Sequence, residues 1–127
     1  GFEVESPPVL CHGILWSIVM YPFGDEEDME GYLSLYLNPH LKSNSSELKT
    51  KFNLGIKNKG LTTFTHSFTE AYLYGSSNFI ERSDVLDMTE GYLVEGTLTV
   101  QADIQIYTES PIHWTTRKTL GCDMSNL

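Results

Sequence analysis

Apolar and polar residues alternate along most of this chain with a repeat of two. The longest such run is Thr97 to Ile106, in which every second residue is apolar. Shorter runs of the same kind, or runs rich in Thr and Phe, lie at Trp16 to Met20, Leu33 to Leu37, Phe52 to Ile56 and Leu61 to Phe68. Successive side chains of a β-strand point to opposite faces, so this repeat predicts strands with one buried face. At least five strands are expected, and seven or eight when short ones are included.

Short polar segments between these runs predict turns. Lys57 to Gly60 joins two alternating runs, and Asn and Gly tolerate the positive φ angles of a hairpin. Ser77 to Arg82 is the best candidate for a short helical turn, which Ser77 could cap. The expected fold class is therefore all-β, an antiparallel sandwich or barrel of seven or eight strands with one short helical turn.

The chain of 127 residues has the length of one domain with a core of its own. The alternation is lost after Glu109, where Ser110 and Pro111 follow. A single domain over residues 1–109 is expected, and residues 110–127 are predicted to form a C-terminal linker toward a following domain.

The charge of the chain limits the partners it can have. Eight Lys and Arg stand against 17 Asp and Glu, which gives a net charge of −9. A negative surface repels polyanions, so nucleic acids and anionic membrane surfaces are poor partners, and basic or neutral partners are favoured. No segment approaches the roughly 20 apolar residues that a membrane-spanning helix needs.

No catalytic or cofactor motif emerges from the sequence. Cys11 beside His12 could be a nucleophilic pair, but such residues usually converge in space and seldom adjoin in sequence. The four histidines have no metal-ligand spacing. The acidic run from Asp25 to Glu30 lacks the turn glycine and spaced ligands of a calcium loop, and is expected to be a solvated loop. We therefore expect no enzyme activity, no metal and no cofactor.

Several segments, taken in chain order, resemble the motifs of MATH (meprin and TRAF homology) domains. Trp16 to Gly24 resembles their W-x-I-x-x-Y-P-x-G signature, and Gly31 to Leu37 is similar to the Y-L-S-L-Y-L strand of the speckle-type POZ, or MATH-BTB, branch. Further matches follow in order at Lys51 to Asn58, Phe79 to Arg82 and Gly91 to Val100. The resemblance implies a TRAF-like β-sandwich. The family's usual first strand, W-x-I-x-N-F, has no counterpart here and is expected to be missing.

MATH domains bind short extended peptides in a shallow groove on one sheet face, so the resemblance implies a peptide-recognition module. Alignment with the speckle-type branch implies a groove of eight residues: Tyr36, Phe52, Thr62, His66, Leu73, Tyr74, Gly75 and Ser76.

The alternation tests two of these positions independently. Tyr36 lies between the apolar Leu35 and Leu37, so it is expected to point outward. Phe52 has the same parity as the apolar Leu54 and Ile56, so the pattern predicts that it lies in the core. Only the alignment indicates that it lines the groove. His66, Leu73, Tyr74 and Ser76 replace the family's Tyr, Asp, Trp and Phe, so the location of the groove is carried over and the peptide sequence is not.

The resemblance to the speckle-type branch implies a substrate adaptor of a cullin-type ubiquitin ligase, in the nucleus or cytoplasm. Its partners would be peptide motifs of substrate proteins and, through a neighbouring domain, the ligase machinery, with no nucleic acid and no membrane. Three alternatives stay open: the MATH domain of a ubiquitin-specific protease, a TRAF-like signalling adaptor, and a structural or oligomerising sandwich without a peptide ligand.

Overall fold

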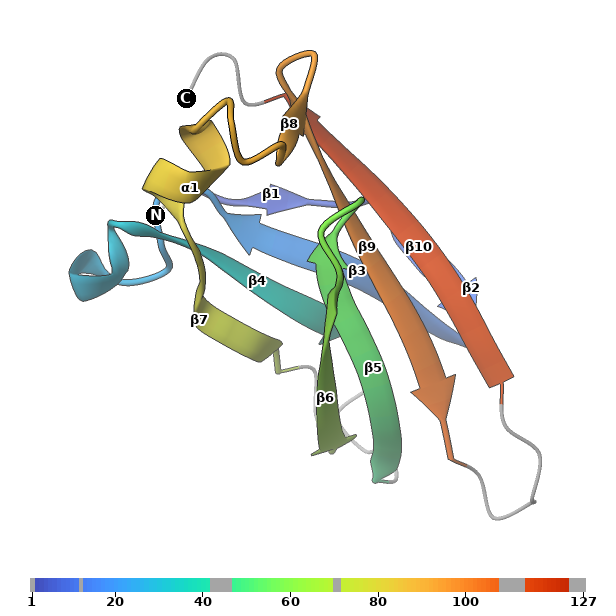
Figure 1. Ribbon diagram of the computed structural model, residues 1–127. Helices are drawn as coiled ribbons and strands as arrows, with labels where there is room; N and C mark the ends of the chain where they lie inside the picture. The colour runs from blue at the N-terminus through green and yellow to red at the C-terminus, as the bar shows by residue number, and fades with distance from the viewer. Residues whose placement is uncertain (1, 12, 42–46, 70–71, 108–113, 124–127) are drawn as a thin grey trace.

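Two antiparallel sheets packed face to face form the molecule (Figure 1). The computed structural model describes residues 2–11, 13–41, 47–69, 72–107 and 114–123. The first sheet has the order β1-β3-β4-β7, with β2 paired to β3, and the second has the order β10-β9-β5-β6, with β8 paired to β9. The strands of the first sheet are β1 Val4–Glu5, β2 Val9–Cys11, β3 Ile14–Tyr21, β4 Tyr32–Pro39 and β7 Tyr74–Glu81. Those of the second are β5 Leu48–Ile56, β6 Leu61–Phe68, β8 Leu93–Val94, β9 Thr97–Ile106 and β10 Trp114–Asp123.

The core lies between the two sheets and follows the alternation of the sequence. Every second residue of β9, from Leu98 to Ile106, is buried, and so are Leu33, Leu35 and Leu37 of β4. Trp16 meets Phe68 across the core, with ring centroids 5.9 Å apart in an edge-to-face arrangement. Burial of these apolar side chains is the main force that holds the two sheets together.

The expected all-β antiparallel sandwich is confirmed, although its details differ. The described residues contain ten strands rather than seven or eight, because β1, β2 and β8 have only two or three residues. The predicted hairpin joins β5 to β6, and both Asn58 (φ 72°) and Gly60 (φ 90°) have positive φ.

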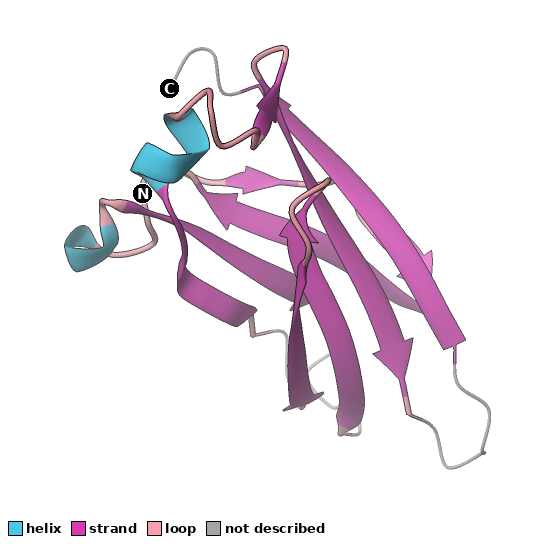
Figure 2. Cartoon of the chain, viewed as in Figure 1, coloured by secondary structure: helices cyan, strands magenta, loops and turns pink. Residues whose placement is uncertain are grey.

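The helical segments lie elsewhere than predicted (Figure 2). Ser77 to Glu81 belongs to β7, and the short helix α1 runs over Arg82–Leu86. The carbonyl of Ser77 accepts a hydrogen bond from the Ser34 hydroxyl at 2.6 Å, which ties this segment to β4 instead of capping a helix. A second short helix, η1 over Glu27–Met29, occupies the acidic run that was expected to be a loop. No helix in the described part of the chain is long and apolar enough to cross a membrane.

Part of the segment predicted to be a linker is a strand. β10 pairs with β9 over its whole length, from Trp114 opposite Ile106 to Asp123 opposite Thr97. The ladder between strands uses main-chain groups, so a polar sequence without alternation can still pair with a strongly patterned neighbour. The loss of alternation after residue 109 therefore did not mark the end of the sheet.

Candidate functional site

One side of the sandwich is formed by the outermost strands of the two sheets. Among the described residues, β7 pairs only with β4, and β6 pairs only with β5. Each strand therefore has one edge whose main-chain N–H and C=O groups are not paired within the sheet. His66 of β6 and Tyr74 of β7 stack with ring centroids 3.8 Å apart, so the two edges lie beside each other. An edge of this kind is a template for a further strand.

Aromatic rings fill the space between these two strands. Tyr74 stacks on His66 at an interplanar angle of 11° and meets Phe64 and Phe52 edge-on, at centroid distances of 6.4 and 6.5 Å. Phe52 and Phe64 stack on each other at 5.2 Å, and Phe68 closes the group beneath His66 at 4.7 Å. We call these five residues the aromatic cluster. Tyr74 is 37% exposed and Phe52 only 1%, so the cluster rests on the core and offers its outer rings to solvent.

Tyr36 lies on the opposite, outer face of the first sheet. A row of directly paired residues crosses this sheet from Glu5 through Val19 and Tyr36 to Gly75 at the edge. The Tyr36 hydroxyl donates a hydrogen bond to the Asp25 carboxylate, and its ring packs edge-on against Tyr21 at 5.9 Å. The pKa of Tyr36 is raised, mainly by burial and then by the hydrogen bond and negative charge of Asp25.

Ser34 connects this outer face to the edge strand. The Asp25 amide donates to the Ser34 hydroxyl oxygen at 3.2 Å, and that hydroxyl donates to the Ser77 carbonyl at 2.6 Å. Ser34 is fully buried, which strengthens both contacts. The loop that carries Asp25 is thereby fixed relative to β7.

Gly75 allows β7 to approach β4 closely. A Cβ atom built on Gly75 would overlap the carbonyl oxygen of Leu35 and would lie 2.8 Å from the Cα of Tyr36. Only glycine fits at this point without a shift of the strand.

The eight residues expected to form one groove are divided between the two sides of β7. Tyr74 and His66 meet in the aromatic cluster, and Leu73 immediately precedes β7. Ser76 pairs with Leu35, and its hydroxyl donates to the Asn78 side chain at 3.0 Å. Thr62 is exposed on β6 and lines a hollow of about 240 Å³ with Phe79 and Tyr92.

Two expectations about this groove need correction. Tyr36 and Gly75 lie on the outer face of the first sheet, so the eight residues do not share one sheet face. Phe52 belongs to the core, as its parity predicted, because its neighbours Leu54 and Ile56 face the same interior. It supports Tyr74 and Phe64 from beneath and offers a ligand almost no surface of its own.

Sequence reasoning missed three residues of this region. Phe64 has the same parity as His66 and Phe68, so the alternation within residues 61–68 contained the signal that could have found it. Tyr21 is the last residue of the alternating strand β3, and its parity predicts that it faces outward. Asp25 could not be found, because its contact with Tyr36 joins a loop to a strand and leaves no periodic pattern.

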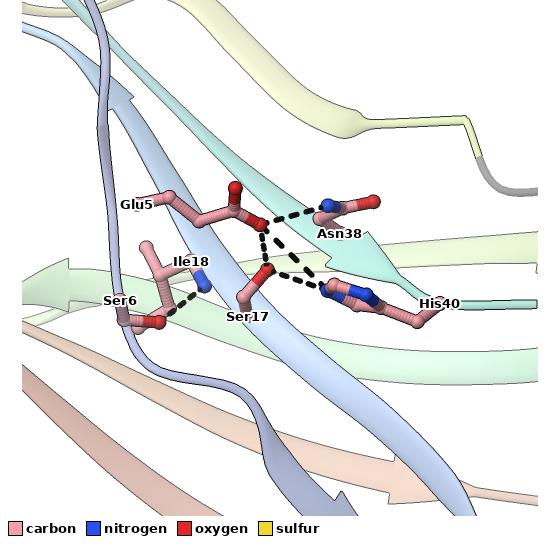
Figure 3. Close-up of polar contacts among 6 residues, drawn as sticks. All are labelled: Glu5, Ser6, Ser17, Ile18, Asn38 and His40. Carbon is pink, nitrogen blue, oxygen red and sulfur yellow. Dashed lines mark hydrogen bonds and ion pairs between the residues drawn. The ribbon is translucent and has the colours of Figure 1, made fainter.

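A serine, a histidine and a glutamate also converge on the outer face (Figure 3). The Ser17 hydroxyl donates to Glu5 and lies 3.0 Å from Nε2 of His40, and the Asn38 amide donates to Glu5 at 3.0 Å. In a hydrolytic triad the acid holds the ring nitrogen remote from the serine. Here Glu5 approaches the same Nε2, at 3.7 Å, and Ser17 is only 3% exposed. The group therefore joins β1, β3 and the end of β4 and has the geometry of a structural contact.

Other candidate chemistry receives no support from the described residues. Cys11 is buried in the core, and its sequence neighbour His12 lies outside the described residues. In the same described ranges, no three His, Cys, Asp or Glu side chains come close enough together to hold a metal ion.

An antiparallel sandwich in which, among the described residues, an edge strand has one unpaired side next to aromatic rings offers a surface of the kind that protein-interaction modules use. Comparison with protein families agrees with this interpretation, since a family model of the MATH domain matches residues 1–104. The chain belongs to the MATH domain family, whose fold serves protein interactions.

Proposed function

We propose that this chain binds a short extended peptide that adds as a strand to the outer edge of β7. The observation that carries the proposal is the arrangement of aromatic rings, with Tyr74 and His66 on one side of this edge and Tyr36 on the other. Side chains of an added strand alternate between two faces, so one set would contact Tyr74 and His66, and a long side chain of the other set could reach Tyr36. A peptide at this edge is therefore consistent with a site that is divided between two faces.

Each of the expected residues has a distinct part in this proposal. Tyr74 and His66 offer ring surface to one set of peptide side chains, and Thr62, Leu73 and Ser76 border that surface. Tyr36 lies within reach of long side chains of the other set, and Gly75 lets β7 lie close to β4 at this point. Phe52 acts indirectly by supporting the rings above it.

The role in a longer protein is a further part of the proposal. The similarity of residues 31–37 to the speckle-type motif supports a substrate adaptor of a MATH-BTB ubiquitin ligase, in the nucleus or cytoplasm. In that role the peptide would come from a substrate protein, and a neighbouring domain would contact the ligase. A ubiquitin-specific protease or a TRAF-like adaptor would use the same edge for a different purpose. We expect no catalysis by this chain, since the candidate serine is buried.

A peptide selection followed by NMR mapping tests the proposal. Random peptides are selected on the immobilised chain, and the best binder is titrated into ¹⁵N-labelled protein. The amide shifts are expected to concentrate at residues 74–81 of β7, at His66 and at Tyr36. Shifts that concentrate on β9 or β10 would contradict the proposed edge. Failure to recover any peptide would favour a purely structural or oligomerising sandwich.

A further inference from the structure

Charge is distributed unequally between the two sheets. The five strands of the first sheet contain no Lys or Arg, and residues 1–41 hold seven acidic residues and likewise no Lys or Arg. The second sheet, in contrast, has Lys49 and Lys51 on β5, and the hairpin that follows has Lys57 and Lys59. The first sheet, together with the segment between β3 and β4, is therefore the more negative side of the molecule.

Three carboxylates on the outer face of the first sheet are held in place mainly by neutral donors. Glu5 accepts from Ser17 and Asn38, and Asp25 accepts from Tyr36. Such contacts fix the position of a carboxylate without cancelling its charge.

The third carboxylate is Glu3, which accepts a hydrogen bond from Tyr21. The pKa of Tyr21 is raised to about 12. Burial is the largest cause, followed by the hydrogen bond and charge of Glu3 and then by the charges of Asp25 and Glu5. The tyrosines of this face thus lie in an environment of unbalanced negative charge.

Two nearby groups can carry positive charge. His40 lies 3.7 Å from Glu5, at the far end of the row from β7. The guanidinium of Arg82 lies over the Phe23 ring at 4.6 Å, and its Nε donates to the Pro22 carbonyl at 2.9 Å. Arg82 borders a hollow that it shares with Asp25 and three glutamates, so carboxylates outnumber it there.

The position of Tyr36 brings this negative charge within reach of the β7 edge. Tyr36 is on β4, and Gly75 is its direct partner on β7. Strands in a sheet are about 4.8 Å apart, so a strand added to β7 would lie about 10 Å from β4. Only a long side chain can cross that distance, over Gly75 to Tyr36.

We infer that the bound peptide carries a Lys or Arg whose side chain crosses Gly75 and ends between the Tyr36 ring and the Asp25 carboxylate. The inference rests on the proposed function, because it assumes a peptide at the β7 edge. A cation there donates a charge-assisted hydrogen bond to the Asp25 carboxylate and makes a cation–π contact with the Tyr36 or Tyr21 ring. An acidic or phosphorylated residue at that position would be repelled by Glu3, Glu5 and Asp25.

Peptide selection with a double substitution tests this inference. Peptides selected on the wild-type chain are expected to share Lys or Arg at one position. Replacing that residue by Met should weaken binding to the wild type at least fivefold. Asp25→Asn should weaken binding of the basic peptide by a similar factor and leave the Met peptide unchanged. Glu95→Gln makes the same charge change in the turn before β9, and should alter neither affinity.

The outcomes separate the two proposals. If the selected peptides perturb β7 amides but show no basic preference, or if Met replaces the basic residue without loss, the inference is wrong and the proposed function stands. If no peptide binds, or if the perturbed amides lie away from β7, the proposed function fails and the inference fails with it. The Met substitution is made in the peptide, so its result does not depend on the folding of a variant.

Discussion

Tyr74 and Tyr36 lie on opposite faces of the first sheet, one on each side of the edge formed by β7. Tyr74 is placed by stacking on His66, whereas Tyr36 is placed by its hydrogen bond to Asp25. The alternation of apolar residues predicted the outward direction of Tyr36 and the core position of Phe52, because both follow from strand parity. The contact of Asp25 could not be predicted, because a loop residue acquires its partner only when the chain folds.

Tyr74→Ala is expected to reduce the affinity for a selected peptide at least tenfold, or about 1.4 kcal/mol. The reason is that an exposed ring at the centre of a contact surface provides more binding energy than residues at its rim. Isothermal titration calorimetry measures the loss, and circular dichroism checks the fold. Met88→Ala removes an exposed side chain from the segment after α1 and serves as the control. Equal affinities of wild type and Tyr74→Ala would remove Tyr74 from the site.

Gly75→Ala is expected to destabilise the protein by about 1–3 kcal/mol, because the added methyl group overlaps the β4 main chain. Gly31→Ala is the matched control, since a Cβ at Gly31 meets nothing within 4 Å. Thermal or urea unfolding compares the two variants. If Gly75→Ala proved as stable as Gly31→Ala, β7 and β4 would have room to separate.

At the scale of elements, the predictability of a strand depended on its length and its pattern. The ten residues of β9 alternate without interruption and were predicted in full. β1, β2 and β8 are too short to show a period, and β10 is in the sheet because β9 pairs with it. The helical turn was misplaced because Ser77 bonds to Ser34 of β4, a long-range contact that local sequence does not contain.

The short strand β1 is expected to depend on the ionised form of Glu5. The pKa of Glu5 lies below its ordinary value of 4.5. The hydrogen bond from Ser17 is the largest cause, and the hydrogen bond from Asn38 and the charge of His40 add to it, whereas burial acts in the opposite direction. Glu5 therefore stabilises the fold above about pH 4.5, and this contribution is lost as the pH falls through the lowered pKa. Glu5→Gln should make the acid decline in unfolding free energy less steep. The decline is measured by urea unfolding between pH 2 and 6, with Glu47→Gln as the control. An identical decline in wild type and Glu5→Gln would mean that the ionised Glu5 does not stabilise the fold.

At the scale of the whole molecule, the net negative charge is concentrated in the first sheet and the segment between β3 and β4 rather than spread evenly. Residues 1–41 contribute seven acidic side chains without a Lys or Arg, and they form most of the first sheet. The net charge of −9 was evident from composition, but its concentration beside β7 required the topology.

Association with basic peptides is therefore expected to depend on salt. Raising the ionic strength from about 0.01 to about 0.15 M shortens the screening length from about 30 to about 8 Å. The association rate of a Lys- or Arg-containing peptide should fall several-fold, while its dissociation rate changes little. Stopped-flow fluorescence measures both rates. Glu27→Gln, in η1, should reduce the salt effect slightly without changing affinity at high salt. A rate independent of salt would mean that the negative face does not guide the peptide.

The most direct test of a peptide strand on β7 is an isotope-filtered NOE experiment on the complex of labelled protein with an unlabelled selected peptide. An added strand brings main-chain protons of the peptide next to those of the edge strand. Cross-strand NOEs are therefore expected between peptide backbone protons and the backbone protons of residues 74–77. NOEs that join the peptide to other strands, or a peptide that touches β7 only through side chains, would contradict the added strand.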